Sequence, residues 1–396
     1  MTTAERFAAL WGELLPVGRA TGGGYVRYAY GEAELDCREW FRAQAAARGL
    51  DVREDGNGNL FAWWGTPGQP AVVTGSHFDS VPHGGAYDGP LGIVSAFLAV
   101  DVLREKGIEP RRPVVVAAFA EEEGSRFGVA CLGSRLLTGA IEPARAVALT
   151  DRDGITLGEA MRRAGLDPGG VGPAPLDTVG CYVELHVEQG RALDVPVGVA
   201  SAIWPHGRWR LDFGGEGNHA GTTRMADRRD PMLTFAHTVL AADERARLAD
   251  AVATIGRVEV APGATNAIAA EVRAWLDARA PDEAALTALV ESIAATAKDR
   301  AARDGTTVAV TAESTSPVVD FDLGLRDRIS RLLGAPVLPT GAGHDAGVLA
   351  ARVPTAMLFV RNPTGVSHSP AEYATDADCA AGVTALAQVL EELACR

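Results

Sequence analysis

Residues 75–89 read GSHFDSVPHGGAYDG, and they directly follow the apolar run of residues 71–74. A short apolar run that ends in a glycine-rich turn is typical of a buried strand. In open α/β sheets, ligands bind beyond the carboxyl ends of the strands. We therefore predict that a strand ends here and that it delivers three metal-type side chains to a site, namely His77, Asp79 and Asp88.

Three more apolar runs of this kind occur along the chain, at residues 113–120, 179–187 and 353–360. Residues 91–106, between the first run and the second, have apolar positions at helical spacing, and Gly107 follows them as a stop signal. Strands that alternate with helices are typical of the α/β class. We therefore predict a mixed, largely parallel sheet with helices on both faces.

The middle of the chain follows a different pattern, in which strand-like and helical segments occur in the order βαββαβ. This order is the split βαβ arrangement of a ferredoxin-like domain. We therefore predict an inserted α+β domain at residues 206–316, flanked by two pieces, 1–205 and 317–396, of the α/β domain. The expected strands cover residues 209–213, 253–260, 267–277 and 307–314, and the expected helices cover residues 231–248 and 282–303.

The composition narrows the classes of partner. The 396 residues are 47% hydrophobic and carry a formal net charge of −14, which argues against nucleic acid or an anionic membrane as the main partner. The sequence has no run of about 18 uncharged apolar residues, which a membrane-spanning helix requires. The five cysteines form no CxxC pair, so we expect reduced thiols and a cytoplasmic location.

Each of the four apolar runs delivers histidine or carboxylate side chains at or near its end. Like-charged carboxylates are costly to gather unless a cation holds them. Imidazole and carboxylate together suit zinc or manganese, and the absence of paired cysteines argues against a structural thiolate site. We therefore predict a hydrolytic metal centre. Its candidate residues at or near the ends of the second, third and fourth runs are Glu121, Glu122, Glu123, His186 and His368.

Seven segments of the chain, in this order and spacing, resemble the amidase branch of the M20 metallopeptidase superfamily. That branch includes N-carbamoyl-L-amino acid hydrolases, allantoate amidohydrolases and β-ureidopropionases. The resemblance implies a zinc-exopeptidase-like catalytic domain with an inserted dimerisation or lid domain. The segments are GSHFDSVPHGGAYDGPLG, FAEEEGSRFG, ELHVEQG, GEGNHAGTTRMADRRDPM, APGATNAIAAEVRAWLDAR, GAGHDAG and GVSHSPAE.

The resemblance implies two divalent metal ions per subunit, zinc in the first place, with manganese or cobalt as alternatives. Asp88 would bridge the two ions, His77 and His186 would complete one ligand sphere, and Glu123 and His368 would complete the other. Asp79 resembles a carboxylate that orients the His77 imidazole through its other ring nitrogen. The alternative interpretation of Asp79 is a solvated loop residue.

Within the acidic triplet, Glu122 matches the general base of the family, and Glu123 matches its metal ligand. Two adjacent glutamates make physical sense because one stays bonded to metal while the other takes a proton from the attacking water. Glu121 departs from the uncharged residue expected at this place. It is interpreted either as a solvated surface charge or as a third carboxylate that raises the pKa values of its neighbours.

The inserted domain is expected to contribute residues as well. By resemblance, His219 acts as an oxyanion donor in the site of the partner subunit of a homodimer, together with Asn266. Arg279 is similar to the clamp of the family for a substrate carboxylate, with a surface salt bridge as the alternative. Gln189 and Gly365 are expected to line the substrate pocket.

Three functions remain open from the sequence. The first is a metal-dependent amidohydrolase of an N-carbamoyl amino acid or allantoate, acting on a small carboxylate substrate. The second is an N-formyl or N-acyl amino acid hydrolase or a dipeptidase on the same scaffold. His186 favours the first, because many peptidase relatives carry a carboxylate at that ligand position. The third is a metal-free binding protein that kept the fold, which the intact metal and base residues disfavour.

Overall fold

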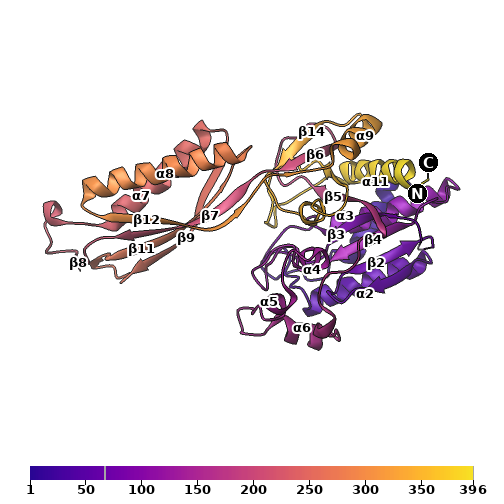
Figure 1. Ribbon diagram of the computed structural model, residues 1–396, viewed down its shortest axis with the longest axis horizontal. Coiled ribbons are helices and arrows are strands. Elements are labelled where there is room, and N and C mark those ends of the chain that lie inside the picture. The colour runs from indigo at the N-terminus through magenta and orange to yellow at the C-terminus, as the bar shows by residue number, and fades with distance from the viewer. Residues whose placement is uncertain (67, 396) are drawn as a thin grey trace. The chain divides into compact units, whose positions relative to one another are not determined.

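The computed structural model describes residues 1–66 and 68–395, and the chain divides into two compact units (Figure 1). The first unit comprises Met1–Ala202 and Asp320–Arg396, and the second comprises Ile203–Val319. Each unit has its own hydrophobic core.

A nine-stranded sheet forms the centre of the first unit, within the part of the chain that the structure describes. Its middle strands β4, β3, β5 and β15 run parallel, whereas β1, β2 and β6 pair antiparallel at the sides. This arrangement confirms the predicted mixed, largely parallel sheet. In spatial order the strands are β1 (Asp51–Glu54), β2 (Leu60–Trp64), β4 (Val114–Phe119), β3 (Ala71–His77), β5 (Val179–Val187), β15 (Thr355–Val360), β6 (Val197–Ile203) and β13 (Val319–Asp320), while β14 (Val337–Thr340) pairs with β6.

Helix α3 (Pro90–Glu105) is the central helix of this unit, because apolar residues surround it and its first half is buried on all sides. One core joins it to one face of the sheet and to α1 (Thr3–Leu14), α2 (Glu32–Ala47) and α11 (Asp376–Leu390). A smaller core joins α4 (Leu132–Thr138), α5 (Pro143–Val147) and α6 (Leu157–Arg163). The remaining elements of this unit are α9 (Leu323–Leu333), α10 (Asp345–Leu349), the 3₁₀ turn Pro168–Gly170 and the π-helical turn Glu391–Cys395.

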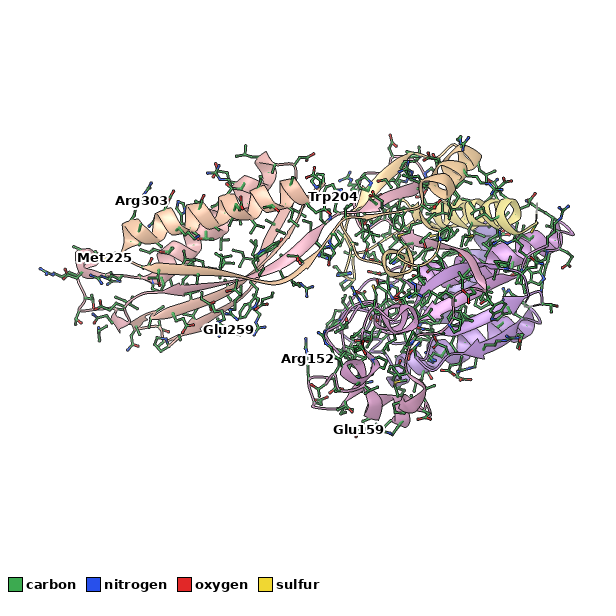
Figure 2. The ribbon with its side chains drawn as sticks, in the orientation of Figure 1. Arg152, Glu159, Trp204, Met225, Glu259 and Arg303 are labelled. Carbon is green, nitrogen blue, oxygen red and sulfur yellow. The ribbon has the colours of Figure 1, made fainter. Side chains whose placement is uncertain are left out.

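The second unit is a four-stranded antiparallel sheet, in the order β12-β7-β11-β9, whose buried side chains share one core with two helices. Burial alternates along β7 and β11, as expected for a sheet with only one covered face. Figure 2 shows Glu259 on the sheet side and Arg303 on the helix side of this unit. The elements are β7 (His206–Gly214), β8 (Asn218–His219), the 3₁₀ turn Met225–Asp227, α7 (Pro231–Leu248), β9 (Val252–Ala261), β10 (Ala267–Ile268), β11 (Glu271–Arg279), α8 (Glu283–Asp304) and β12 (Thr307–Ser316).

The predicted bounds of one strand of this unit are wrong. Residues 267–277 form two strands, because β10 leaves the main sheet and pairs with β8 in a separate ladder. The apolar pattern runs through the break at Ala269 and Ala270, so the sequence carries no signal for it. In neither unit does a described helix have the length and apolar character needed to cross a membrane.

Gly75 shows how closely the central strands approach near the site. Its φ is +148°, and a Cβ built there would lie 1.9 Å from the backbone oxygen of Ala117 in β4. We expect Gly75→Ala to lower the free energy of unfolding by about 1–3 kcal/mol, the usual cost of overpacking. Urea denaturation followed by circular dichroism measures the loss.

Gly107→Ala is the matched control for this prediction. Gly107 also has a positive φ, +68°, but a Cβ there would meet no atom within 4 Å. Equal losses in the two variants would show that backbone conformation alone sets the cost, and that the close approach of β3 and β4 contributes nothing.

Candidate metal centre

Four strands of the first unit bring histidines and carboxylates together at their carboxyl ends. His77 is the last residue of β3 and pairs in register with Phe119, the last residue of β4. His186, near the end of β5, pairs with Phe359 of β15. The segments that follow these strands carry Asp79, Asp88, Glu121, Glu122, Glu123 and His368. The parallel arrangement therefore gathers side chains that are far apart in sequence.

Asp88 lies in the middle of this cluster. Its Oδ1 is 3.6 Å from Nε2 of His77 and 3.2 Å from Nε2 of His186. Its Oδ2 is 3.3 Å from Nε2 of His368, which in turn is 3.5 Å from Oε2 of Glu123. Two three-residue ligand groups therefore share the Asp88 carboxylate, one with the two buried histidines and one with Glu123 and His368.

The buried histidines fit a divalent cation. Nδ1 of His77 lies 2.9 Å from the backbone oxygen of Asp79, and Nδ1 of His186 lies 2.9 Å from the backbone oxygen of Val187. Because a carbonyl oxygen only accepts, each Nδ1 carries the proton, and each Nε2 presents a lone pair toward Asp88. Both Nε2 atoms are buried and make no hydrogen bond. A cation between these lone pairs and the carboxylate satisfies all three groups.

The pKa values of the carboxylates in the cluster are shifted by burial and by their charged neighbours. Burial, together with neighbouring acids, raises the pKa of Glu122 well above its usual range and that of Glu123 to about 7. Burial also opposes ionisation of Asp88, yet the three imidazoles next to its carboxylate lower its pKa well below the usual value. Bound cations would let these carboxylates remain ionised together.

Glu122 lies beside the candidate metal ligands. Its Oε2 lies 3.6 Å from Nε2 of His77, and its Oε1 accepts a hydrogen bond from the thiol of Cys131 at 3.4 Å. Its backbone oxygen accepts from the amide of Cys131 at 2.6 Å. A carboxylate that is buried, fixed and close to one ligand group has the placement that proton transfer to or from a coordinated water requires.

The hydrogen bond that the His77 ring was expected to donate to the Asp79 carboxylate is not the one observed. The backbone oxygen of Asp79 holds Nδ1, whereas the nearer carboxylate oxygen is 3.7 Å from it. The carboxylate instead accepts the amides of Glu122 at 3.1 Å and Glu123 at 3.0 Å. Asp79 is 1% exposed, so it is not a solvated loop residue. It fixes the segment that bears the expected base and ligand.

Interpreting Glu121 as a solvated surface charge is also wrong. The residue is 1% exposed and has a φ of +54°. Its Oε1 accepts the amides of Arg126 at 2.9 Å and Phe127 at 2.7 Å. Burial and the charge of Asp79 raise the pKa of Glu121 to about 8. Glu121 is therefore a third buried carboxylate that shapes the turn after β4.

The two residues expected to line the pocket lie in the same unit. Nε2 of Gln189 donates to Oδ2 of Asp88 at 2.9 Å and to Oγ of Ser367 at 3.2 Å. Gly365 has a φ of +68°, and its amide donates to the Asn362 side chain at 3.1 Å within the turn that leads to His368. Gln189 thus contacts the ligand cluster directly, and Gly365 shapes the turn that carries one ligand.

The three expected residues of the inserted domain lie in the second unit. His219 in β8 pairs with Ala267 in β10, and the amide of Ala220 donates to the backbone oxygen of Asn266 at 3.0 Å. These bonds place His219 in one small ladder and Asn266 directly before it. Arg279 ends β11, where its Nε donates to Asp277 at 3.0 Å.

Sequence reasoning assigned no role to several residues that border the ligand cluster. The His344 ring lies 4.5 Å from the His186 ring, and its Nε2 is buried without a hydrogen bond. The next residue, Asp345, accepts a 2.5 Å hydrogen bond from Ser134. The GAGHDAG segment was the available signal, because it places a histidine directly before α10 and an acid at its first position.

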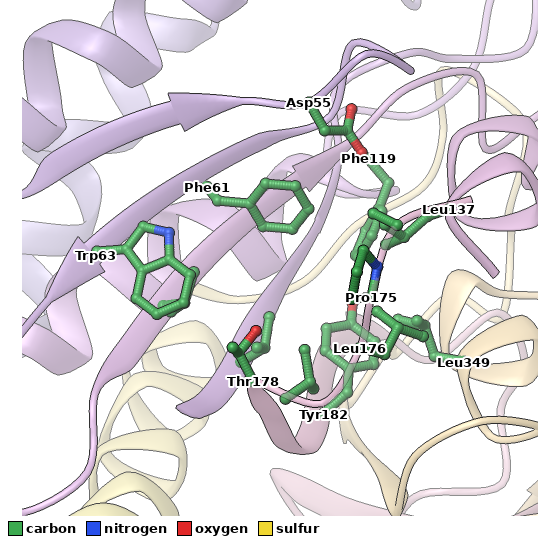
Figure 3. A pocket seen from close by; sticks show the side chains of 14 residues that line it. Asp55, Phe61, Trp63, Phe119, Leu137, Pro175, Leu176, Thr178, Tyr182 and Leu349 are labelled. Atoms are coloured by element: carbon green, nitrogen blue, oxygen red, sulfur yellow. The ribbon is translucent and has the colours of Figure 1, made fainter. Parts of the chain in front are cut away.

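A separate apolar cavity of about 150 Å³ lies on the same sheet, and Figure 3 shows the aromatic rings of Phe61, Trp63 and Tyr182 around it. Asp55 also borders it, but the amides of Asn57 and Asn59 satisfy both of its carboxylate oxygens. The cavity holds no ligand group comparable to the Asp88 cluster among the described residues. The candidate site for catalysis is therefore the Asp88 cluster at the carboxyl ends of the strands, and not this cavity.

The chain is similar to known amidohydrolases and amidases over almost its whole length. The chain is 37% identical to the N-carbamoyl-L-amino acid amidohydrolase of Geobacillus stearothermophilus, over 100% of this chain and 99% of that protein. It is 34% identical to the allantoate amidohydrolase of Escherichia coli K12, over 95% of each. A crystal structure of a hydantoinase/carbamoylase family amidase from Burkholderia ambifaria matches with a TM-score of 0.88 at 30% identity, over 99% of this chain and 97% of that one.

The family described as peptidase family M20/M25/M40 matches residues 73–392, which include every ligand of the candidate metal centre. The relatives named above are amidohydrolases and amidases of this family, which confirms the resemblance seen in the sequence. The chain therefore belongs to peptidase family M20/M25/M40, in its amidase branch.

Proposed function

We propose that this protein is a metal-dependent amidohydrolase that cleaves the carbamoyl C–N bond of an N-carbamoyl-L-amino acid or of allantoate. The observation that carries the proposal is the Asp88 carboxylate shared by two ligand groups, with Glu122 beside one of them. The activities named for the relatives support the substrate class. A metal-free binding protein would not need a buried carboxylate fixed next to the ligands.

In this proposal His77, Asp88 and His186 hold one ion, and Asp88, Glu123 and His368 hold the other. The ligand set of imidazole and carboxylate suits zinc, with manganese or cobalt as alternatives. A divalent pair, when bound, supplies Lewis acidity to the substrate carbonyl and to the attacking water. Glu122 takes a proton from that water and returns it to the leaving nitrogen.

Residues of the second unit complete the proposed site. His219 and Asn266 stabilise the developing oxyanion, and Arg279 binds the substrate carboxylate through its forked guanidinium. We propose that they act across a homodimer, so that the second unit of one subunit serves its partner. The exposed edge strand β9 and the exposed Leu240 and Leu248 of α7 support a contact between copies. The five free cysteines support a cytoplasmic location.

The function is tested by metal removal and a substrate panel. We expect exhaustive chelation to abolish activity and zinc, manganese or cobalt to restore it, because the ligand cluster requires a cation. Among N-carbamoyl, N-formyl and N-acetyl amino acids, allantoate and dipeptides, the carbamoyl or ureido compounds should be cleaved fastest, as measured by release of amine or ammonia. Carboxamide forms of the same substrates should react poorly if Arg279 binds the carboxylate.

Full activity in verified metal-free protein would disprove the metal-dependent mechanism. Preferential cleavage of formyl, acetyl or dipeptide substrates would assign the chain to the other hydrolase class on this scaffold.

Glu122→Gln should lower kcat at least about 10²-fold, the low end for removal of a general base. The metal content should stay unchanged, because Glu122 belongs to neither three-residue ligand group. The matched control is Glu121→Gln, since a glutamine oxygen can still accept the amides of Arg126 and Phe127. Steady-state kinetics and metal analysis separate the two, and a near-normal kcat in Glu122→Gln would place the base elsewhere.

The shared site is tested by complementation. Chains with His219→Ala are mixed with chains with Glu122→Gln, each nearly inactive alone. If sites are composite, the mixed dimer has one site with an intact base and an intact His219, and sizeable activity returns. Subunit exchange is verified with two affinity tags. Exchange without recovery would show that His219 serves its own chain.

A further inference from the structure

Glu372, four residues after His368, is a buried carboxylate that the proposed mechanism does not use. It is 5% exposed. Its Oε1 accepts the backbone amide of Tyr87 at 2.9 Å and that of Asp88 at 3.0 Å. Its Oε2 accepts the hydroxyl of Ser367 at 3.3 Å. Both oxygens thus accept hydrogen bonds, and Glu372 belongs to no candidate ligand group among the described residues.

The loop before Asp88 is shaped to admit this carboxylate. A Cβ built at Gly85 would lie 2.2 Å from Oε1 and 2.6 Å from Cβ of Glu372. Glycine at this position therefore lets the backbone of residues 85–88 close around the acid. The neighbouring rings of Tyr87 and Tyr373 meet edge to face with centroids 6.3 Å apart. Two segments that are far apart in sequence are joined at this point.

Glu372 reaches Asp88 by two routes. The direct route is the hydrogen bond to the Asp88 amide, which fixes its backbone. The second route runs through Ser367, whose hydroxyl donates to Glu372 and accepts from Gln189, while Gln189 donates to Oδ2 of Asp88. Asp88 is therefore fixed at its main chain and at its carboxylate by one closed ring of hydrogen bonds.

We propose that Glu372 is a positioning residue that sets the bridging geometry of Asp88 and thereby couples the two metal positions. This role rests on the metal centre of the proposed function. Glu372 touches no reacting group, and it acts by holding the Asp88 backbone and carboxylate in the orientation that both ions share. The acceptor geometry of its side chain matters for this role, and its charge matters less.

The test compares Glu372→Leu, which removes both acceptors, with Glu372→Gln, which keeps an oxygen for the two amides and replaces the acceptor of the Ser367 hydroxyl with a donor that the Ser367 oxygen can accept. Two readouts are independent of turnover. Hydrogen-exchange mass spectrometry of the metal-free protein follows the peptide that covers residues 84–90. Titration with cobalt(II) follows the affinity of the two sites and the visible absorption spectrum of the bound ions.

We expect Glu372→Leu to speed exchange in the 84–90 peptide at least about tenfold, because its two amides lose their acceptor. Cobalt(II) affinity should fall about 10- to 100-fold, as is usual when the partner of a metal ligand is lost, and the absorption spectrum should change. Glu372→Gln should stay within about threefold of the unmutated protein in both measurements. Gly85→Ala displaces the carboxylate without removing it, so it should behave like Glu372→Leu. It replaces Glu372→Leu in both measurements if Glu372→Leu does not fold.

Asp378→Leu is the matched control. Asp378 is a buried acid of the same unit, 2% exposed, and it pairs with Arg361 and does not contact Asp88. Its loss should lower the melting temperature while leaving exchange in the 84–90 peptide and cobalt(II) affinity unchanged.

Two results would overturn the proposal. One is unchanged exchange and cobalt(II) binding in Glu372→Leu and Gly85→Ala, and the other is equal damage in Glu372→Gln and Glu372→Leu. These outcomes are distinguishable from failure of the proposed function. If no compound of the substrate panel is hydrolysed but Glu372→Leu weakens cobalt(II) binding as expected, the positioning role stands and the amidohydrolase assignment fails.

Discussion

The structure depends on one buried carboxylate surrounded by three imidazoles. Asp88 is 4% exposed, and its oxygens lie 3.2–3.6 Å from the Nε2 atoms of His77, His186 and His368. Two of these nitrogens present lone pairs toward it, which is unfavourable without a cation between them. The three imidazoles come from distant parts of the sequence: two lie on β3 and β5, and one follows β15. The neighbouring parallel strands β3, β5 and β15 bring them to one point.

Glycines make this convergence sterically feasible. Gly89 has a φ of +87°, and a Cβ there would lie 2.6 Å from the His77 ring. Helix α3 therefore begins directly against the first ligand, and Asp88 sits at its start. Gly85 has the corresponding role toward Glu372. These positions explain why the turn after β3 is rich in glycine as well as in ligands.

The sequence predicted the fold class and the gathering of histidines and carboxylates at the strand ends, because both depend on strong local signals. Buried parallel strands appear as apolar runs, and their ends carry the ligands. The sequence did not predict the break between β10 and β11, because the pairing of β10 with β8 is a tertiary contact. It did not predict the burial of Glu121 or the bonds of Glu372 for the same reason. Their partners are backbone amides, which are present at almost every residue and leave no signal in the sequence.

The turn after β4 gives three consecutive glutamates three different environments. Glu121 turns inward at a φ of +54° and binds the backbone amides that follow it. Glu122 lies between the Cys131 thiol and the His77 ring, and Glu123 approaches His368. The Asp79 carboxylate accepts the amides of Glu122 and Glu123 and so fixes the backbone from which both side chains extend. This turn, with its left-handed residue at Glu121, thus separates a structural acid from the proposed base and the proposed ligand.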